Sequence, residues 1–343
     1  MSDLVYIQTE PNKIVLGHGA LTLSDQPDSL KPCFYFNDYF LTYTKPWIIA
    51  EHISEFTISE FLSFLQNSSN TDLKQETKFD WINFEQDKFK KFFHKIKLSI
   101  SEGIIEKIVP VVFEKSNIPQ YLNGNFINYI SSKFSNFCKD HLVLHGLEIN
   151  RQGRCGLTPE ILVETKNNKI ISFALAGTTL AANGDKSLDN PKDLREHQLV
   201  VDDIHNALLK FGKPKVGKSF VCRIGSLSHL KAEVSVETES KTNLDQIVKV
   251  LHPTAALGVF PRSTNSNVIL KSSDSKLPRG EFASPFGIQF PDGRSLCIAS
   301  IRSCFWDNSH LKIAAGCGII EESILEDEIE ELKIKLNSIK NRF

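Results

Sequence analysis

The sequence LCIASIRSCFWDNSHLKIAAGCGIIEESILEDEIEELKIKLNSIK, which spans residues 296–340, combines three patterns that decide the fold. Its first part, residues 296–306, has the composition and alternation of a strand. Residues 315–318 read Ala-Gly-Cys-Gly, which predicts a glycine turn. Apolar residues then recur at helical spacing over residues 325–339 and predict an amphipathic helix. The end of the chain therefore predicts strands and helices in one domain.

The same mixture continues toward the N-terminus. Helices are predicted over residues 89–100 and 193–209, and strands over residues 108–113 and 169–175. The second of these strands runs into an expected tight turn at Gly177. Because helices and strands do not alternate regularly along the chain, the patterns predict an α+β fold rather than a doubly wound one.

The composition is that of an ordinary globular protein. The 343 residues are 41% hydrophobic and 24% charged, and the formal net charge is -1. A nearly neutral chain gives no electrostatic reason to bind nucleic acid or an anionic membrane. No apolar stretch approaches the roughly 20 residues that span a bilayer. Seven scattered cysteines without a C-x-x-C pair suit free thiols in a reducing compartment, so we expect a cytoplasmic protein.

Two of the predicted helices carry carboxylates beside their apolar faces. Glu328, Glu331 and Lys335 share one line of the C-terminal helix, and Asp193 and Glu196 are spaced by one turn in the other. Mg²⁺ takes oxygen ligands and usually binds only one or two protein carboxylates. The spacing is compatible with a magnesium site, but by itself it more commonly indicates solvated helix faces.

Nine short segments, in this order, resemble the chorismate-utilising enzymes, a family of isochorismate, salicylate, anthranilate and aminodeoxychorismate synthases. They are Lys107-Ile108-Val109, Thr158-Pro159-Glu160, Leu175-Ala176-Gly177-Thr178, Arg195-Glu196-His197, His252-Pro253-Thr254-Ala255-Ala256, Arg279 to Gly287, Ile301-Arg302-Ser303, Ala315-Gly316-Cys317-Gly318-Ile319 and Glu328 to Leu336. Each segment alone is a weak signal. Together they make the chain similar to this family from about residue 90 to the end.

The resemblance implies a chorismate-binding fold like that of anthranilate synthase component I. In this fold two α/β halves form an antiparallel β-sandwich with helices outside and the site in a cleft. We assign residues 1–75, up to a polar loop over residues 67–80, to the N-terminal part of the fold. Residues 76–343 are then the chorismate-binding catalytic region.

The resemblance also implies the ligands of the site. Mg²⁺ would bind the ring carboxylate of chorismate and be held by Glu196 and Glu331, with Asp193 and Glu328 in support. A planar guanidinium suits the second, enolpyruvyl carboxylate of the substrate, and a lysine adds a point charge. The residues expected around the substrate are Arg302, Lys335, Gly177, Thr178, Gly316, Gly318 and His252.

Lys107 distinguishes the members of the family. Anthranilate-type and aminodeoxychorismate-type enzymes resemble one another in having Gln near this place and using ammonia, whereas isochorismate and salicylate synthases have Lys and use water. Ala256 stands where salicylate and anthranilate synthases usually carry Thr. The chain therefore most resembles isochorismate synthases. The Pro-Thr-Ala-Ala run at residues 253–256 and Arg195-Glu196 followed by residues 199–204 look most like the menaquinone-pathway type. The resemblance implies that Lys107 is the base for water addition at C2 and Glu160 the acid for loss of the C4 hydroxyl.

Two other interpretations stay open. A salicylate synthase would form isochorismate and then eliminate pyruvate, and a non-catalytic protein with the chorismate fold would only bind a ligand. The chain departs from the family pattern at Ala314, Val259 and Ser284, which puts the shape of the enolpyruvyl pocket in doubt. We expect a monomer, because no heptad pattern argues for a coiled-coil partner.

Overall fold

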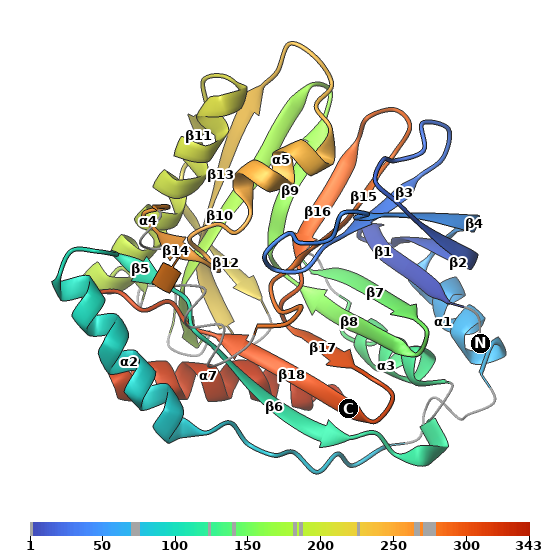
Figure 1. Ribbon diagram of the computed structural model, residues 1–343, viewed down its shortest axis with the longest axis horizontal. Helices are drawn as coiled ribbons and strands as arrows, with labels where there is room; N and C mark the ends of the chain where they lie inside the picture. The colour runs from blue at the N-terminus through green and yellow to red at the C-terminus, as the bar shows by residue number, and fades with distance from the viewer. Residues whose placement is uncertain are drawn as a thin grey trace.

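One antiparallel sheet organises the computed structural model, which describes residues 3–69, 76–122, 125–138, 142–180, 184, 188–224, 227–263, 268–269 and 279–343. The described strands join this 16-stranded sheet in the order β11-β13-β10-β9-β16-β15-β3-β4-β2-β1-β7-β8-β17-β18-β6, and β12 pairs with β13 (Figure 1). A separate two-stranded sheet consists of β14 and β5.

The strands have the following bounds: β1 Leu4–Glu10, β2 Lys13–Ser24, β3 Cys33–Phe36, β4 Trp47–Phe56, β5 Lys107–Ile108, β6 Val111–Asn117, β7 Val143–Ile149, β8 Gln152–Thr158, β9 Ile161–Lys166, β10 Lys169–Leu180, β11 Lys215–Val216, β12 Phe220–Ile224, β13 Leu227–Glu237, β14 Val259–Phe260, β15 Pro285–Gln289, β16 Ser295–Ala299, β17 Ser303–Trp306 and β18 His310–Gly316.

The helices cover different parts of the sheet (Figure 1). They are α1 Ile58–Asn67, α2 Gln86–Ser101, α3 Phe126–Ser135, α4 Pro191–Leu208, α5 Leu244–Leu251 and α7 Leu325–Lys340, with 3₁₀ turns at Gln120–Leu122 and Leu209–Phe211. Helix α4 packs on β10 and β13, whereas α7 packs on β18 and contacts α2. None of the described helices combines the length and apolar composition that a membrane span requires.

A buried cluster made only of strand residues forms the interior of a sandwich. Val5, Phe34, Leu147, Phe286 and Ile298 are among its members, and they come from β1, β3, β7, β15 and β16. No helix contributes to this cluster, so these strands must bury one another's apolar faces. The two other clusters lie between strands and helices. The predicted α+β fold with an antiparallel sandwich and outer helices is confirmed.

The N-terminal strands lie inside the sheet rather than beside it. Strand β1 pairs with β7, and β3 pairs with β15, so strands from residues 1–75 are bonded on both sides to strands from residues 76–343. The division of the chain at residue 75 stays a prediction. The expected loop at residues 67–80 lies partly outside the described residues. Of its described part, Asn67 ends α1, and residues 68–69 and 76–80 contain no helix or strand.

The strand predicted over residues 296–306 is wrong as one element. Strand β16 pairs with β15 and β9, whereas β17 pairs with β8 and β18, so the chain leaves one half of the sheet and enters the other. The crossing occupies residues 300–302, where Arg302 has a positive φ of 53°. Alternation therefore stops at Ala299, and the backbone of Arg302 is set by this crossing.

Three smaller expectations also need correction. The chain does not turn at Gly177: β10 continues to Leu180, and Gly177, with a φ of 68°, forms a bulge opposite β13. Residues 315–318 form no turn either, since Gly316 ends β18 and the backbone of Ile319 bonds to that of Ile108. The strand expected at residues 108–113 is split in two before Val111. The helices predicted at residues 89–100, 193–209 and 325–339 are present.

Candidate active site

A narrow cavity lies where α4, α7 and the ends of β10, β13 and β18 meet. It has a volume of about 70 Å³. Nine residues predicted from the sequence line it, namely Glu160, Gly177, Thr178, Glu196, Arg302, Gly316, Gly318, Glu331 and Lys335. These residues come from six separate segments of the chain, and only the tertiary structure brings them together. Ala256 and Ala314 also line the cavity, and their small side chains widen it locally.

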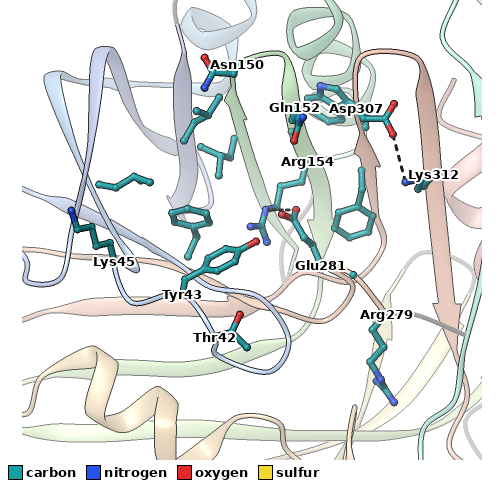
Figure 2. Close-up of a pocket in the computed structure, with 18 of the residues that line it drawn as sticks. Thr42, Tyr43, Lys45, Asn150, Gln152, Arg154, Arg279, Glu281, Asp307 and Lys312 are labelled. Atoms are coloured by element: carbon teal, nitrogen blue, oxygen red, sulfur yellow. Dashed lines mark ion pairs between the residues drawn. The ribbon is translucent and has the colours of Figure 1, made fainter. Parts of the chain in front are cut away.

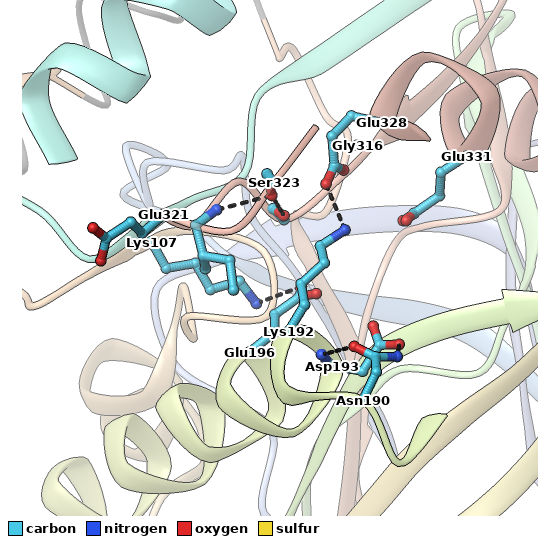
Figure 3. Close-up of polar contacts among 12 residues, drawn as sticks. Lys107, Asn190, Lys192, Asp193, Glu196, Gly316, Glu321, Ser323, Glu328 and Glu331 are labelled. Atoms are coloured by element: carbon cyan, nitrogen blue, oxygen red, sulfur yellow. Dashed lines mark hydrogen bonds and ion pairs between the residues drawn. The ribbon is translucent and has the colours of Figure 1, made fainter. Parts of the chain in front are cut away.

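Lys107 is buried next to Glu196 and Gly318, two residues that line this cavity, but it does not line the cavity itself. It begins β5, whose pairing with β14 and whose backbone bonds to Ile319 fix its position. The Nζ atom lies 3.0 Å from Oε1 of Glu196, and it makes no hydrogen bond of good geometry within the described part of the chain. Burial by itself raises the pKa of Glu196, but the charge of Lys107 outweighs it and holds this pKa below its usual value. A buried amine beside an ionised carboxylate is the result (Figure 3).

Gly318 makes this close approach possible. A Cβ atom at Gly318 would lie only 2.0 Å from Oε1 of Glu196 and 2.9 Å from Cε of Lys107. Any larger residue would therefore collide with both side chains. Close approach, rather than a positive φ, is the physical reason for glycine at this position.

Glu160 faces the same cavity from the loop between β8 and β9. Its side chain is buried, and burial raises its pKa to about 8, against the opposing positive charges of Lys107, Lys231 and Lys335. The backbone N–H of Glu160 donates to Oγ1 of Thr158 at 3.1 Å, which helps to fix the loop. At neutral pH this carboxyl group keeps its proton and can act as an acid.

Helix α7 contributes a second carboxylate and a second amine. Oε1 of Glu331 lies 2.5 Å from Nζ of Lys335, one helical turn later. The same Nζ donates a hydrogen bond of 2.8 Å to the carbonyl of Gly316. The helix places both side chains on its cavity side because the apolar stripe beside them is buried.

Glu328 and Asp193, the two carboxylates expected to support the metal ligands, are close to the cavity but do not line it. Oε1 of Glu328 is 2.7 Å from Nζ of Lys192, and burial together with the charge of Glu331 raises the pKa of Glu328 to about 7. Asp193 is held by Asn190, and its Cβ lies 3.2 Å from the position that a Cβ of Gly177 would take. Burial raises the pKa of Asp193.

This group of carboxylates fits a divalent cation in its donor type. Glu196 and Glu331 offer oxygens to one cavity from two helices, and Oε2 of buried Glu328 has no hydrogen-bond partner among the described residues. In the part of the chain that the structure describes, no three or more His, Cys, Asp or Glu side chains are grouped so that they could hold a metal ion. A magnesium site of two carboxylates, water and substrate oxygens does not need such a group.

Arg302 and a histidine that the sequence did not single out, His229, also line the cavity. Nη1 of Arg302 donates to Oγ of Ser338 at 2.8 Å, and burial lowers the pKa of this guanidinium to about 10. Nδ1 of His229 lies 3.1 Å from Oγ1 of Thr178 and 3.2 Å from the carbonyl of Gly177. Burial and the nearby charges of Arg302 and Lys335 lower the pKa of His229 to about 3, so its ring is neutral.

The sequence contained a weak signal for His229. It stands among the alternating residues of the strand at residues 227–237, where a polar ring on a buried face requires a partner. The pairing of His229 with Thr178 across the bulge supplies that partner, and pairing of strands this far apart cannot be read from one sequence.

His252 does not line this cavity, although we expected it in the wall of the site. It ends α5, and its Nε2 lies 2.9 Å from the carbonyl of Tyr39. Burial lowers its pKa to about 4, so it is a neutral core residue. Of the unusual positions, Val259 pairs with Ile108, and Ser284 accepts a hydrogen bond of 2.6 Å from Nη1 of Arg154. Neither of these two lines the narrow cavity.

A second and much larger cavity of about 1050 Å³ contains none of the predicted site residues (Figure 2). Tyr43, Arg154, Glu281, Asp307 and Lys312 are among its lining residues. Nε of Arg154 lies 3.3 Å from Oε2 of Glu281, and Lys312 pairs with Asp307 at 3.6 Å. Size alone would have selected this cavity, whereas the convergence of buried acids and amines selects the narrow one.

An antiparallel sandwich with buried acids and amines in one cavity is the architecture expected of a chorismate-binding protein. A model of the family described as chorismate binding enzyme matches residues 42–342. The chain therefore belongs to the chorismate binding enzymes.

Individual proteins that are similar to this chain are chorismate-utilising enzymes as well. The salicylate biosynthesis isochorismate synthase of Pseudomonas aeruginosa is 29% identical over 196 residues, 54% of this chain and 40% of that protein. Isochorismate synthase MenF of Haemophilus influenzae is 26% identical over 305 residues, 85% of this chain and 67% of that protein. The solved structure of MenF, the menaquinone-specific isochorismate synthase from Escherichia coli, has the same fold, with a TM-score of 0.78, 17% identity and coverage of 99% of this chain and 88% of that chain. The chain spans about half the length of the curated relatives that it matches.

Proposed function

We propose that this chain is an isochorismate synthase, which converts chorismate into isochorismate with the help of Mg²⁺. One observation carries the proposal: a buried carboxyl group with a pKa of about 8, Glu160, shares one cavity with Glu196 and Glu331, and the buried amine of Lys107 lies 3.0 Å from Glu196. The isochorismate synthases among the relatives support the choice of reaction.

The reaction adds water at ring C2, shifts the double bonds and expels the hydroxyl group at C4. Water is a poor nucleophile, and hydroxide is a poor leaving group. Lys107, in its neutral form, accepts a proton from the attacking water. Glu160 donates its proton to the departing hydroxyl group, which leaves as water. One water is consumed and one is released, so the reaction is an isomerisation.

The pKa of Glu160 matches this role. A carboxyl group at its ordinary pKa would have lost its proton at neutral pH, whereas burial keeps Glu160 protonated up to about pH 8. Lys107 is buried and lies next to the carboxylate of Glu196. Movement of Glu196 away from the amine would favour the neutral form that a base requires.

The two carboxylates of the substrate need two cationic sites. Glu196 and Glu331 would hold Mg²⁺, which when bound neutralises the ring carboxylate and withdraws charge from the ring. At the other end Arg302 offers a guanidinium fork to the enolpyruvyl carboxylate, with Lys335 beside it. Gly316 and Gly318 keep the backbone close to the ring.

Incubation of the purified protein with chorismate and Mg²⁺, followed by chromatography, tests the proposal. Isochorismate as the product, and its loss on addition of a chelator, are expected. Salicylate, detected by its fluorescence, would identify the protein as a salicylate synthase. Chorismate binding without turnover would identify a non-catalytic member of the family. Either of these results would overturn the proposal.

We also propose that the protein acts as a monomer in the cytoplasm and that its product serves menaquinone synthesis. The MenF relatives support the pathway. Light scattering during gel filtration tests the oligomeric state, and complementation of a strain that lacks its own menaquinone-specific isochorismate synthase tests the pathway.

A further inference from the structure

Both carboxylates that we propose for Mg²⁺ already hold a lysine. Glu196 pairs with Lys107 at 3.0 Å, and Glu331 pairs with Lys335 at 2.5 Å. Figure 3 shows the first pair beside Lys192 of α4, whose amine pairs with Glu328 of α7. In the absence of a metal, every one of these three carboxylates therefore has an ammonium group as its counter-ion.

The two pairs are shielded from water. The side chains of Lys107 and Glu196 are 1% and 12% exposed, and those of Lys335 and Glu331 are 16% and 20% exposed. A buried carboxylate is costly unless a cation compensates it. The lysines supply that compensation.

An ammonium group and Mg²⁺ cannot share these oxygens. Mg²⁺ binds oxygen at about 2.0–2.1 Å, and a positive charge about 3 Å from the same oxygen would be strongly repelled in a buried site. Binding of a divalent cation to Glu196 and Glu331 must therefore move both amines away or remove their charge.

We propose that Lys107 and Lys335 occupy the metal's carboxylates in the metal-free protein and that a divalent cation displaces them. The exchange frees Lys107 for proton transfer and Lys335 for the substrate carboxylate. Metal binding and the release of both catalytic-site amines therefore occur in one step. The consequence for catalysis rests on the proposed function, whereas the exchange itself does not require any turnover.

The surroundings of the two lysines allow the exchange. Lys335 already donates to the carbonyl of Gly316, so its amine has a second partner at 2.8 Å when Glu331 is taken by a metal. Lys107 has a fixed backbone, and the space in front of Gly318 is already filled by Oε1 of Glu196, so the amine of Lys107 leaves this oxygen only by rotation of its own side chain.

Titration of the metal-free protein with Mn²⁺, followed by electron paramagnetic resonance, tests the competition without substrate. Lys335→Met and Lys107→Met are each expected to tighten Mn²⁺ binding by about tenfold, because an opposite charge within a few ångströms shifts such equilibria by about one to three powers of ten. Lys335→Arg keeps the charge and should bind as the wild type does. Lys312→Met removes a lysine of the other cavity and should have no effect.

A smaller gain in Lys192→Met, whose amine pairs with Glu328 rather than with a proposed ligand, would separate direct competition from distant electrostatics. Unchanged or weaker Mn²⁺ binding in folded Lys335→Met and Lys107→Met, or an equal gain in Lys192→Met, would overturn the proposal.

Chemical labelling gives an independent measurement. Reductive methylation followed by mass spectrometry should modify Lys335 several-fold faster when Mg²⁺ is present, while Lys312 is modified at an unchanged rate. Equal labelling of Lys335 with and without Mg²⁺ would contradict the exchange. Because neither experiment contains chorismate, a failed exchange and a failed isochorismate synthase assignment would be told apart.

Discussion

The narrow and the wide cavity of this molecule differ in volume, about 70 Å³ against about 1050 Å³, and in how far their charged side chains are exposed to water. In the wide cavity Asp307 and Lys312 are 39% and 49% exposed, so water compensates their charges. In the narrow one the lining residue Glu196 and its partner Lys107 behind it are 12% and 1% exposed, and the pKa of Glu160 is raised to about 8. General acid catalysis at neutral pH requires a carboxyl group with a raised pKa, and burial in the narrow cavity provides it at Glu160.

The small volume of the narrow cavity also has a consequence. A space of about 70 Å³ holds a few waters rather than an aromatic-sized dicarboxylate. Lys335, bonded to both Glu331 and Gly316, occupies part of the space between α7 and β18. Displacement of the lysines by a metal would therefore widen the cavity and make their amines available to the substrate.

The largest effect on catalysis is expected for Lys107→Ala, which removes the buried amine beside the narrow cavity. It should lower kcat by about 10⁴-fold, the upper end for a general base, while chorismate still binds because Arg302 and Lys335 remain. Steady-state kinetics and calorimetric binding of chorismate measure the two effects. Normal turnover in this variant would show that the buried amine has no part in the reaction.

The acid side of the mechanism predicts a pH dependence. Glu160 acts only while protonated, and its pKa is raised to about 8, so kcat should fall as the pH rises above about 8. Glu160→Gln should lower kcat by about 10²–10³-fold and remove this alkaline limb. A pH–rate profile of both proteins checks the assignment, and an unchanged alkaline limb in the variant would assign it to another group.

The next effect concerns the close contact at Gly318. Gly318→Ala would place a methyl group 2.0 Å from Oε1 of Glu196 and push this carboxylate out of position. Displaced support around a metal site typically costs about 10–100-fold in metal affinity. Calorimetric titration with Mg²⁺ measures the loss, and Gly217→Ala, where an added Cβ meets no atom closer than 3.4 Å and which does not line the cavity, controls for general effects of the added methyl group. Wild-type Mg²⁺ affinity in Gly318→Ala would remove Glu196 from the ligand set.

The smallest effect on catalysis is expected in the wide cavity. Arg154→Met removes a buried guanidinium that bonds to Ser284 and pairs with half-exposed Glu281. We expect a loss of about 1–3 kcal/mol in the free energy of unfolding, measured by urea denaturation, with kcat changed less than about twofold. A large fall in kcat at preserved stability would mean that the two cavities are coupled.

Part of the fold could be predicted from local patterns. The helices at α2, α4 and α7 follow from apolar spacing, because burial of one face requires that spacing wherever the helix packs. The segment at residues 296–306 could not be predicted correctly, because its two halves pair with different partners and the break at Arg302 is imposed by those partners. The bulge at Gly177 was missed for the same reason.

The candidate site shows the same division. Residues such as Lys107, Glu160 and Glu331 could be selected because their segments resemble a family, whereas spacing alone left the solvated alternative open. His229 was not predicted from the sequence, because its environment depends on a bulge in a neighbouring strand. His252 was expected in the wall, yet it bonds to Tyr39 in the core.

The residue types, the buried faces of helices and strands, and the resemblance to a family can all be read from the order of amino acids. Which acids and amines are neighbours, and hence which of them are charged, depends on how distant segments pack. The physical reason is that a pKa and an ion pair depend on desolvation and on atoms within a few ångströms. In this chain those atoms come from segments as far apart as Lys107 and Lys335.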